Sequence, residues 1–170
     1  MNKGAVSLRP IDWRHFPFLW SLLGDAKVRA HLGGIVPMRQ RPARIWHWIR
    51  QQPDSFIWVA HHGQSPVGIV FVDPARQHGL LELSFMFARD SWGKGLARAA
   101  VTQALALVPR DVQIIAETRA ANARARDLLT AIGWVKTDDL TRFGVAQVVY
   151  RPPSPDPSAT PAAVSSSHAG

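Results

Sequence analysis

The chain has 170 residues, of which 46% are hydrophobic, a formal net charge of +8 and no cysteine. Its length and hydrophobic content predict one globular domain with a substantial core. The lack of cysteine excludes disulfides, thiolate metal sites and a cysteinyl intermediate in any group transfer. No apolar run is long enough to span a membrane and there is no charged-then-apolar leader, so we expect a cytoplasmic protein without membrane partners.

The positive charge could indicate a nucleic-acid partner, but its distribution disfavours that reading. Lysine and arginine are spread along the chain from Lys3 to Arg151 without a dense run. The nearest approach to a cluster is Arg39, Arg41, Arg44 and Arg50. A solvated basic surface explains this pattern better, and the same positive field would attract a polyphosphate cofactor.

Hydrophobic periodicity and turn residues predict the elements in the order β-αα(α)-βββ-α-β-α-ββ. The strands are predicted over 6–10, 56–61, 67–72, 80–87, 112–118, 134–137 and 145–151. The helices are predicted over 13–23 and 25–32, from about residue 42, over 95–108 and over 122–132. This order predicts an α/β fold, a mixed sheet with helices on both faces.

Residues 1–151 are predicted to form the domain, and residues 152–170 to form a disordered tail. The tail is rich in proline, serine and alanine and has no apolar periodicity. A segment of this composition cannot bury enough apolar area to order itself.

The third predicted helix carries tryptophans on different faces, and two interpretations of them are open. Ile45, Trp48, Ile49 and Gln52 share one face, which we interpret as a core face. The alternative hypothesis is that Trp46 or His47 lines a substrate pocket.

The helix predicted over 95–108 begins without the acidic residues that usually stabilise a helix N-terminus. No aspartate or glutamate occurs from Ser91 to Arg110. Backbone N–H groups in an N-terminal turn favour an anion, and glycines allow a diphosphate to approach them closely. We therefore predict an anion-binding turn made by Gly93, Lys94, Gly95, Leu96 and Ala97. The P-loop pattern fails because Gly95 follows Lys94, and the dinucleotide pattern fails because position 98 is arginine.

Two motifs, separated along the chain as in the family, resemble those of the GNAT superfamily of N-acetyltransferases. The first is "WGKGLA", from Trp92 to Ala97, which is similar to the family's pyrophosphate motif. The second is "NARARDLLTAIGW", which begins at Asn122. The resemblance implies a splayed, largely antiparallel sheet, acetyl-CoA as cosubstrate, and transfer of acetyl to a primary amine.

Three positions differ from the residues that are usual in the family. Trp92 replaces the usual arginine or glutamine, which resembles the branch of ribosomal-protein N-terminal acetyltransferases. Leu129 stands where many members place a tyrosine that acts as general acid, so no general acid is assigned. Ala125 replaces a serine and thereby removes a hydroxyl contact to the cofactor.

Acetyl transfer to an amine requires a neutral amine, and an alkyl amine has a pKa of about 10. In the strand over 80–87, alternation places Glu82 on the face of Ser84 and Met86. A carboxylate in a central strand is costly unless it is paired or used. We predict that Glu82 is the general base, acting through water, with Glu117 as the reserve candidate. The alternative is that Glu82 forms a structural ion pair, for example with Arg119 or Lys136.

The resemblance implies further cofactor contacts. The backbone around Phe85, Met86 and Phe87 would pair with the pantetheine arm, and one main-chain N–H there could stabilise the oxyanion. Asn122 would cap its helix and could also contact the cofactor.

The histidines predict no metal, because His31, His61, His62 and His78 lack ligand spacing. The segments expected to select the acceptor are rich in tryptophan and poor in acids, so a protein N-terminus or a small neutral amine fits better than a polycation. The alternative function is a non-catalytic CoA-binding module. We expect a monomer or homodimer.

Overall fold

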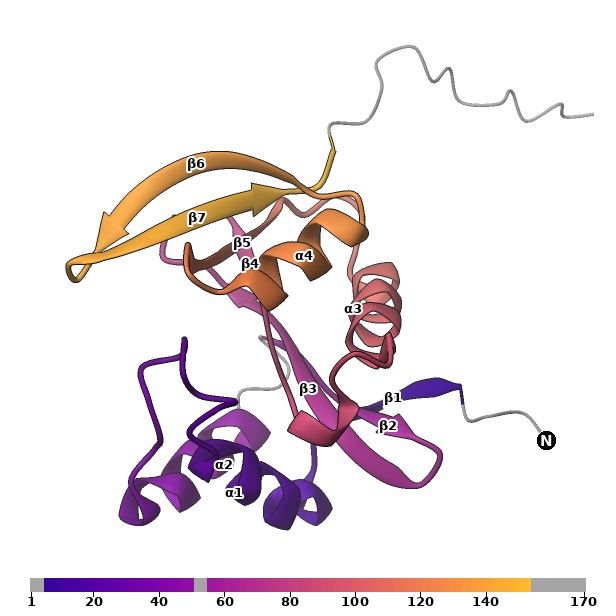
Figure 1. Cartoon of the computed structure of the whole chain (residues 1–170). Helices are drawn as coiled ribbons and strands as arrows, with labels where there is room; N and C mark the ends of the chain where they lie inside the picture. The colour runs from indigo at the N-terminus through magenta and orange to yellow at the C-terminus, as the bar shows by residue number, and fades with distance from the viewer. Residues whose placement is uncertain (1–4, 51–54, 154–170) are drawn as a thin grey trace, which may run out of the picture.

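The computed structural model describes residues 5–50 and 55–153, and these form one sheet flanked by helices (Figure 1). The seven strands are β1 Val6–Pro10, β2 Phe56–His62, β3 Ser65–Pro74, β4 Leu81–Phe87, β5 Ile114–Arg119, β6 Val135–Arg142 and β7 Val145–Arg151. Their order in the sheet is β1-β2-β3-β4-β5-β7-β6. Within it only β4 and β5 pair in parallel. The predicted α/β fold is confirmed.

The α-helices lie on both faces of the sheet, as predicted (Figure 1). They are α1 Phe16–Gly24, α2 Arg41–Arg50, α3 Leu96–Leu107 and α4 Ala123–Ala131. Single 3₁₀ turns cover Trp13–His15, Met38–Gln40 and Arg89–Ser91. Among these described helices, none is long and apolar enough to cross a membrane.

Alternation along the central strands divides the core into two parts. On one face, Val70, Val72 and Leu83 pack with α3 and α4. On the other face, Ile69 and Phe71 pack with α1 and α2. The two halves of the core thus fix both helix pairs relative to β3 and β4, which carry the site described below.

The helix predicted over 25–32 is wrong. α1 ends at Gly24, and residues 26–33 form a series of turns. The Asp25 carboxylate accepts the N–H groups of Lys27 and Val28, at 2.8 and 3.2 Å. The Arg29 side chain donates to the carbonyls of Leu32 and Gly34, at the end of the same segment. Side-chain bonds to the backbone therefore replace the helical pattern here.

The third predicted helix is α2, and its core face is confirmed. Ile45 is fully buried, whereas Trp46 is 48% exposed. His47 is exposed as well, and neither Trp46 nor His47 lines either of the two described cavities, so nothing here supports the hypothesis that one of them lines a pocket. The last strand pair extends further than predicted, because β6 continues to Arg142 as an exposed strand paired with β7.

The tail predicted over 152–170 lies outside the described residues from position 154 onward. Pro152 and Pro153 follow β7 as exposed residues without regular structure.

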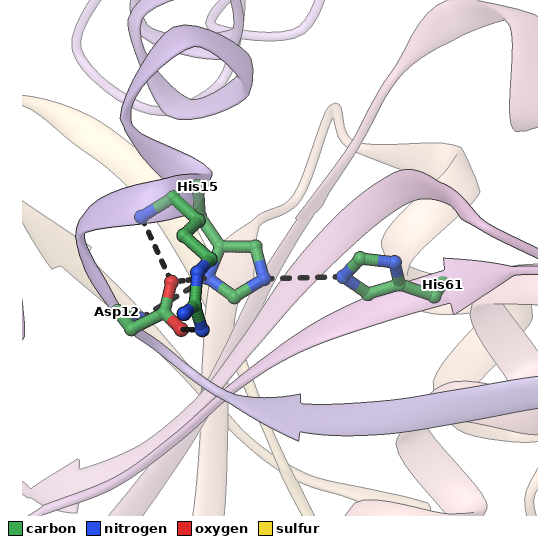
Figure 2. Close-up of polar contacts among 4 residues, drawn as sticks. Asp12, His15 and His61 are labelled. Atoms are coloured by element: carbon green, nitrogen blue, oxygen red, sulfur yellow. Dashed lines mark hydrogen bonds and ion pairs between the residues drawn. The ribbon is translucent and has the colours of Figure 1, made fainter.

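Two histidines meet in the interior, where the 3₁₀ turn Trp13–His15 contacts β2 (Figure 2). His15 and His61 are 7% and 5% exposed, and their Nε2 atoms lie 3.1 Å apart. His15 Nδ1 lies 3.1 Å from both the backbone nitrogen and Oδ1 of Asp12. One Nε2 must donate and the other accept, so this contact requires at least one neutral ring.

This pair predicts a loss of stability in acid. Burial, and then the positive charge of Arg9, lower the pKa of His61; the backbone of Gln64 raises it by less, and His15 and Asp12 have the smallest effects. The folded state therefore keeps His61 neutral at pH values where the unfolded chain binds a proton, near pH 6.5. Its stabilising contribution is complete above about pH 6.5 and is lost as the pH falls below that value.

The variant His61→Gln isolates this effect, because glutamine can accept the same hydrogen bond without titrating. We expect the Tm of His61→Gln minus that of the wild type to increase between pH 7.5 and pH 5. Thermal melts at each pH measure the difference, with the exposed His62→Gln as control. A difference that does not vary with pH would contradict the prediction.

Candidate active site

The sheet opens between its two parallel strands. β4 and β5 share only two residue pairs, Leu81 with Ile114 and Glu82 with Ile115. Beyond these pairs β4 stays bonded to β3 and β5 stays bonded to β7. The facing edges of the two strands are therefore unpaired from residue 83 and residue 116 onward.

The register of β4 determines which backbone groups face this opening. Ala88 N–H donates to Val67 O at 2.9 Å, toward β3, and hydrogen-bonded pairs alternate along an antiparallel ladder. The backbone groups of Met86 therefore also point toward β3, and those of Phe85 and Phe87 point toward the opening. The Phe87 carbonyl already accepts the Trp92 indole N–H at 2.9 Å. Among the described residues, this leaves three backbone groups of β4 facing the opening without a partner: the Phe85 N–H, the Phe85 C=O and the Phe87 N–H.

The turn before α3 borders the same opening. Gly93 and Gly95 have φ of +71° and +72°, a backbone conformation that favours glycine, and nothing lies within 4 Å of where a Cβ would stand. Gly95 is the residue before α3, whose first turn holds no acidic residue. The predicted turn is therefore an exposed helix N-terminus with open space above its glycines.

A cavity of about 360 Å³ occupies the opening. It is lined by parts of β4, β5, α4, the 91–98 segment and the 27–32 loop. Of the predicted cofactor residues, the cavity is lined by Phe85, Met86, Phe87, Trp92, Gly93, Gly95, Ala97 and Asn122. Lys94 and Leu96 are not among its lining residues: Lys94 is exposed and Leu96 packs against the core.

Two arginines at this cavity were missed by the sequence analysis. The Arg124 guanidinium carbon lies 3.9 Å from the centre of the Trp92 ring, a cation–π contact, and both residues line the cavity. Arg98 lines it as well. Both arginines add positive charge beside the glycine turn. No local pattern links Arg124 to Trp92, because the contact joins two segments far apart in the sequence.

Asn122 caps α4, as predicted. Its Oδ1 accepts Ala125 N–H at 3.3 Å, and its Nδ2 donates to Thr118 Oγ1 at 3.2 Å. These bonds engage both the oxygen and the nitrogen of the Asn122 amide, and the residue also borders the cavity.

Glu82 lies on the α1/α2 face of the sheet, opposite Asp73 in β3. Burial, then the negative charges of Glu117 and Asp73, raise the pKa of Glu82 to about 7, against the smaller effects of Arg76 and Arg142. Among the described residues, its carboxylate has no ion pair or hydrogen bond. Glu82 lines neither of the two described cavities, so a proton could reach it only through intervening water.

The structural ion pair considered for Glu82 is absent from the described residues. Lys136 pairs instead with Asp139 at 2.7 Å. Glu117, the reserve base, lines the cavity but is paired with Arg142 at 2.6 Å. Asp73, Glu82 and Glu117 share one face of the sheet, so carboxylates do lie near the opening, contrary to the expectation drawn from the helices and loops alone.

Leu129 is 1% exposed and belongs to the core between α4 and the sheet, while its edge lines the cavity. Ala125 is also buried on this side of α4. No group of three or more histidine, aspartate or glutamate residues with metal-binding geometry occurs within the described ranges.

A mixed sheet splayed beside the 93–97 glycine turn, with a cavity joining the two, is an arrangement that can hold a cosubstrate carrying a diphosphate. The family model described as acetyltransferase (GNAT) domain matches residues 6–135, and the chain belongs to the GNAT acetyltransferase family. No curated protein matches the chain.

Solved structures share the fold at low sequence identity. Spermidine N-acetyltransferase from Vibrio cholerae, in complex with CoA and spermine, is 17% identical, with a TM-score of 0.71 over 86% of this chain and 94% of its own. A GNAT-family acetyltransferase from Bacillus anthracis is 13% identical, with a TM-score of 0.71 over 88% and 95%. Aminoglycoside acetyltransferase AAC(6')-Ib in complex with coenzyme A is 16% identical, with a TM-score of 0.67 over 86% and 94%.

Proposed function

We propose that this chain transfers acetyl from acetyl-CoA directly to a primary amine, either a protein N-terminus or a small molecule. The observation that carries the proposal is that the glycine turn and the unpaired edge of β4 open into one cavity. Two structural neighbours, a spermidine N-acetyltransferase and an aminoglycoside acetyltransferase, support an amine acceptor. "WGKG" at Trp92 supports a place near the branch of ribosomal-protein N-terminal acetyltransferases.

The diphosphate of the cosubstrate is proposed to bind at residues 93–97. The N–H groups of this turn and the N-terminus of α3 favour negative charge. Arg98 and Arg124 add positive charge at the cavity wall. Leu96 and Lys94 contribute backbone only in this proposal, because neither side chain lines the cavity.

The pantetheine arm is proposed to pair with the free edge of β4. Phe85 offers both backbone groups and Phe87 offers its N–H, while Met86 contributes its side chain. Asn122 borders the same cavity from α4 and is proposed as a further contact. A preorganised N–H on β4 would stabilise negative charge on the acyl oxygen.

Acetyl-CoA supplies an acetyl thioester when bound. The acceptor nitrogen forms the new C–N bond, the C–S bond breaks with its electron pair leaving on sulfur, and the proton lost from nitrogen ends on that sulfur. Glu82 is proposed to take a different proton, the one that an ammonium acceptor loses before it attacks, through water, and to release it to solvent. Its raised pKa of about 7 suits a base that works near neutral pH.

A non-catalytic CoA-binding module is the alternative function. The observation that favours it is Leu129, a buried aliphatic residue where many relatives place a tyrosine. Such a module would use the cavity for binding without transferring the acetyl group.

Cofactor binding is tested by thermal melting. Acetyl-CoA should raise the Tm by mass action, and 3′-dephospho-CoA should still bind because the turn is proposed to hold the diphosphate. Gly95→Asp should abolish the shift, since it places negative charge beside the phosphates. Equal melting curves with and without millimolar acetyl-CoA would contradict the proposal.

The control for this variant is Gly79→Asp. Gly79 has φ of +80° and open space around it, so the substitution brings a similar backbone penalty outside the cavity. Gly79→Asp should keep the shift that Gly95→Asp loses.

A further inference from the structure

Arg29 is a buried cation without a carboxylate partner. The residue is 8% exposed and lies in the turns between α1 and α2. Within the described parts of the chain, no carboxylate lies within 4.0 Å of its guanidinium. Burial, and then the positive charge of Arg44, lower the pKa of Arg29. A charge buried in this way is costly unless an anion or sufficient hydrogen bonds compensate it.

Its hydrogen bonds do not use the whole guanidinium. Nε donates to Gly34 O at 2.9 Å and Nη2 donates to Leu32 O at 2.5 Å. Nη1 has only the sulfur of Met86, at 3.6 Å, which is a weak acceptor. Arginine carries five N–H donors, so one on each terminal nitrogen has no acceptor among the described residues. Two such donors are what a carboxylate binds best.

Arg29 lines a second cavity of about 140 Å³. Trp48 and Phe71, packed edge to face at 5.0 Å, form its apolar wall, and Asp73 lines it as well. This volume is well below the roughly 300–1,000 Å³ of pockets for drug-sized ligands. The cavity therefore fits a small acceptor.

The second cavity adjoins the first at the strand proposed to bind the pantetheine arm. Leu32 and residues 84–86 line both cavities. An amine entering the second cavity would approach the acyl group at Ser84–Met86. Asp73 and the neighbouring Glu82 provide negative charge for the amine, and Arg29 provides positive charge for an anionic group.

We propose that Arg29 binds a carboxylate of the acceptor, and that the acceptor is a small amino acid carrying both an amine and a carboxylate. This inference rests on the proposed acetyltransferase function and specifies its substrate class. The alternative is that Arg29 only anchors the loop through Leu32 and Gly34.

The test compares matched acceptors with the full chain and acetyl-CoA. Each set contains a free amino acid, its carboxamide and the amine that lacks the carboxyl group, for glycine, alanine, leucine and phenylalanine. Release of the CoA thiol gives kcat/KM, expressed per concentration of neutral amine because the three amines differ in pKa. We expect the free amino acid to exceed its carboxamide by about 10- to 100-fold, the effect of a charge-assisted bond.

Arg29→Gln should abolish the ratio of free amino acid to carboxamide, beyond any loss common to all acceptors from the bonds to Leu32 and Gly34, and Arg29→Lys should restore part of that ratio. Arg50→Gln, an exposed arginine of α2 stacked on Trp46, is the matched control and should keep the preference. A loop anchor would affect all three acceptors alike in Arg29→Gln.

Two outcomes overturn the inference and are distinguishable. Equal or better turnover of carboxamides by the wild type would overturn it and leave the acetyltransferase proposal intact. If none of these acceptors gives thiol release, despite a thermal shift with acetyl-CoA, the inference is overturned, and peptides with free N-termini then decide whether the acetyltransferase proposal stands.

Discussion

Replacing Glu82 by glutamine is expected to lower kcat near pH 7 by about 10²- to 10⁴-fold, the usual contribution of a general base. Glutamine keeps the shape of the side chain but cannot accept a proton. The affinity for acetyl-CoA should stay unchanged, since Glu82 does not line the cofactor cavity. The loss should shrink as the pH rises toward the pKa of the amine, because solvent then supplies the neutral amine. Steady-state kinetics over pH 6 to 10 measure both effects.

The same variant has a second readout in stability. The pKa of Glu82 is about 7 in the folded protein, against an ordinary value of 4.5. The folded state therefore favours the protonated form, and its stability falls as the pH rises through 7. Glu82→Gln should raise the Tm at pH 8 relative to the wild type and have little effect at pH 4.5. If Glu82 formed a structural ion pair instead, the same substitution would lower the Tm.

Glu117→Gln distinguishes the two candidate bases. Glu117 is held by Arg142, so we expect its substitution to affect turnover much less than Glu82→Gln. Wild-type turnover and pH profile in Glu82→Gln would refute the assignment of Glu82. A large loss in Glu117→Gln at the same time would transfer the role to Glu117.

Leu129→Ala is expected to cost about 2–5 kcal/mol of stability, the range for a buried leucine truncated in a packed core. The side chain is 1% exposed and packs between α4 and the sheet. In a domain of this size, that loss corresponds to a fall in Tm of roughly 5–15 °C. Thermal or urea unfolding measures it.

Two controls separate packing from general sensitivity to substitution. Leu129→Met conserves volume and should cost less than about 1.5 kcal/mol. Leu107→Ala removes a leucine that is 58% exposed and should change stability by no more than about 0.5 kcal/mol. A Tm in Leu129→Ala equal to that of Leu107→Ala would show that Leu129 is not part of the packed core.

The features predicted well from the sequence depend on neighbouring residues. The glycines of the 93–97 turn, the capping of α4 by Asn122 and the alternation along β4 each depend on a few consecutive positions. Local backbone preferences and periodicity determine such features, so one sequence is enough to find them.

The features that sequence reasoning missed arise from contacts between distant segments. Arg124 meets Trp92 only after α4 packs beside the opening, and His15 meets His61 only when the first helical segment contacts β2. The second cavity joins Arg29, Trp48 and Asp73 from three separate segments. No periodic pattern encodes these juxtapositions.

The wrong helix over 25–32 has a related cause. Its apolar spacing is compatible with a helix, but Asp25 and Arg29 use their side chains on backbone groups. Competition between side-chain and helical hydrogen bonds depends on the tertiary position of Arg29, which composition and spacing do not show.

The most direct test of the central claim is product analysis by mass spectrometry after incubating the chain with acetyl-CoA and a broad panel of primary amines, including peptides with free N-termini. We expect an N-acetylated product and an equimolar amount of free CoA thiol, both lost in Gly95→Asp and retained in Gly79→Asp. Binding of acetyl-CoA without an acetylated product from any amine would contradict the account and support a CoA-binding module instead.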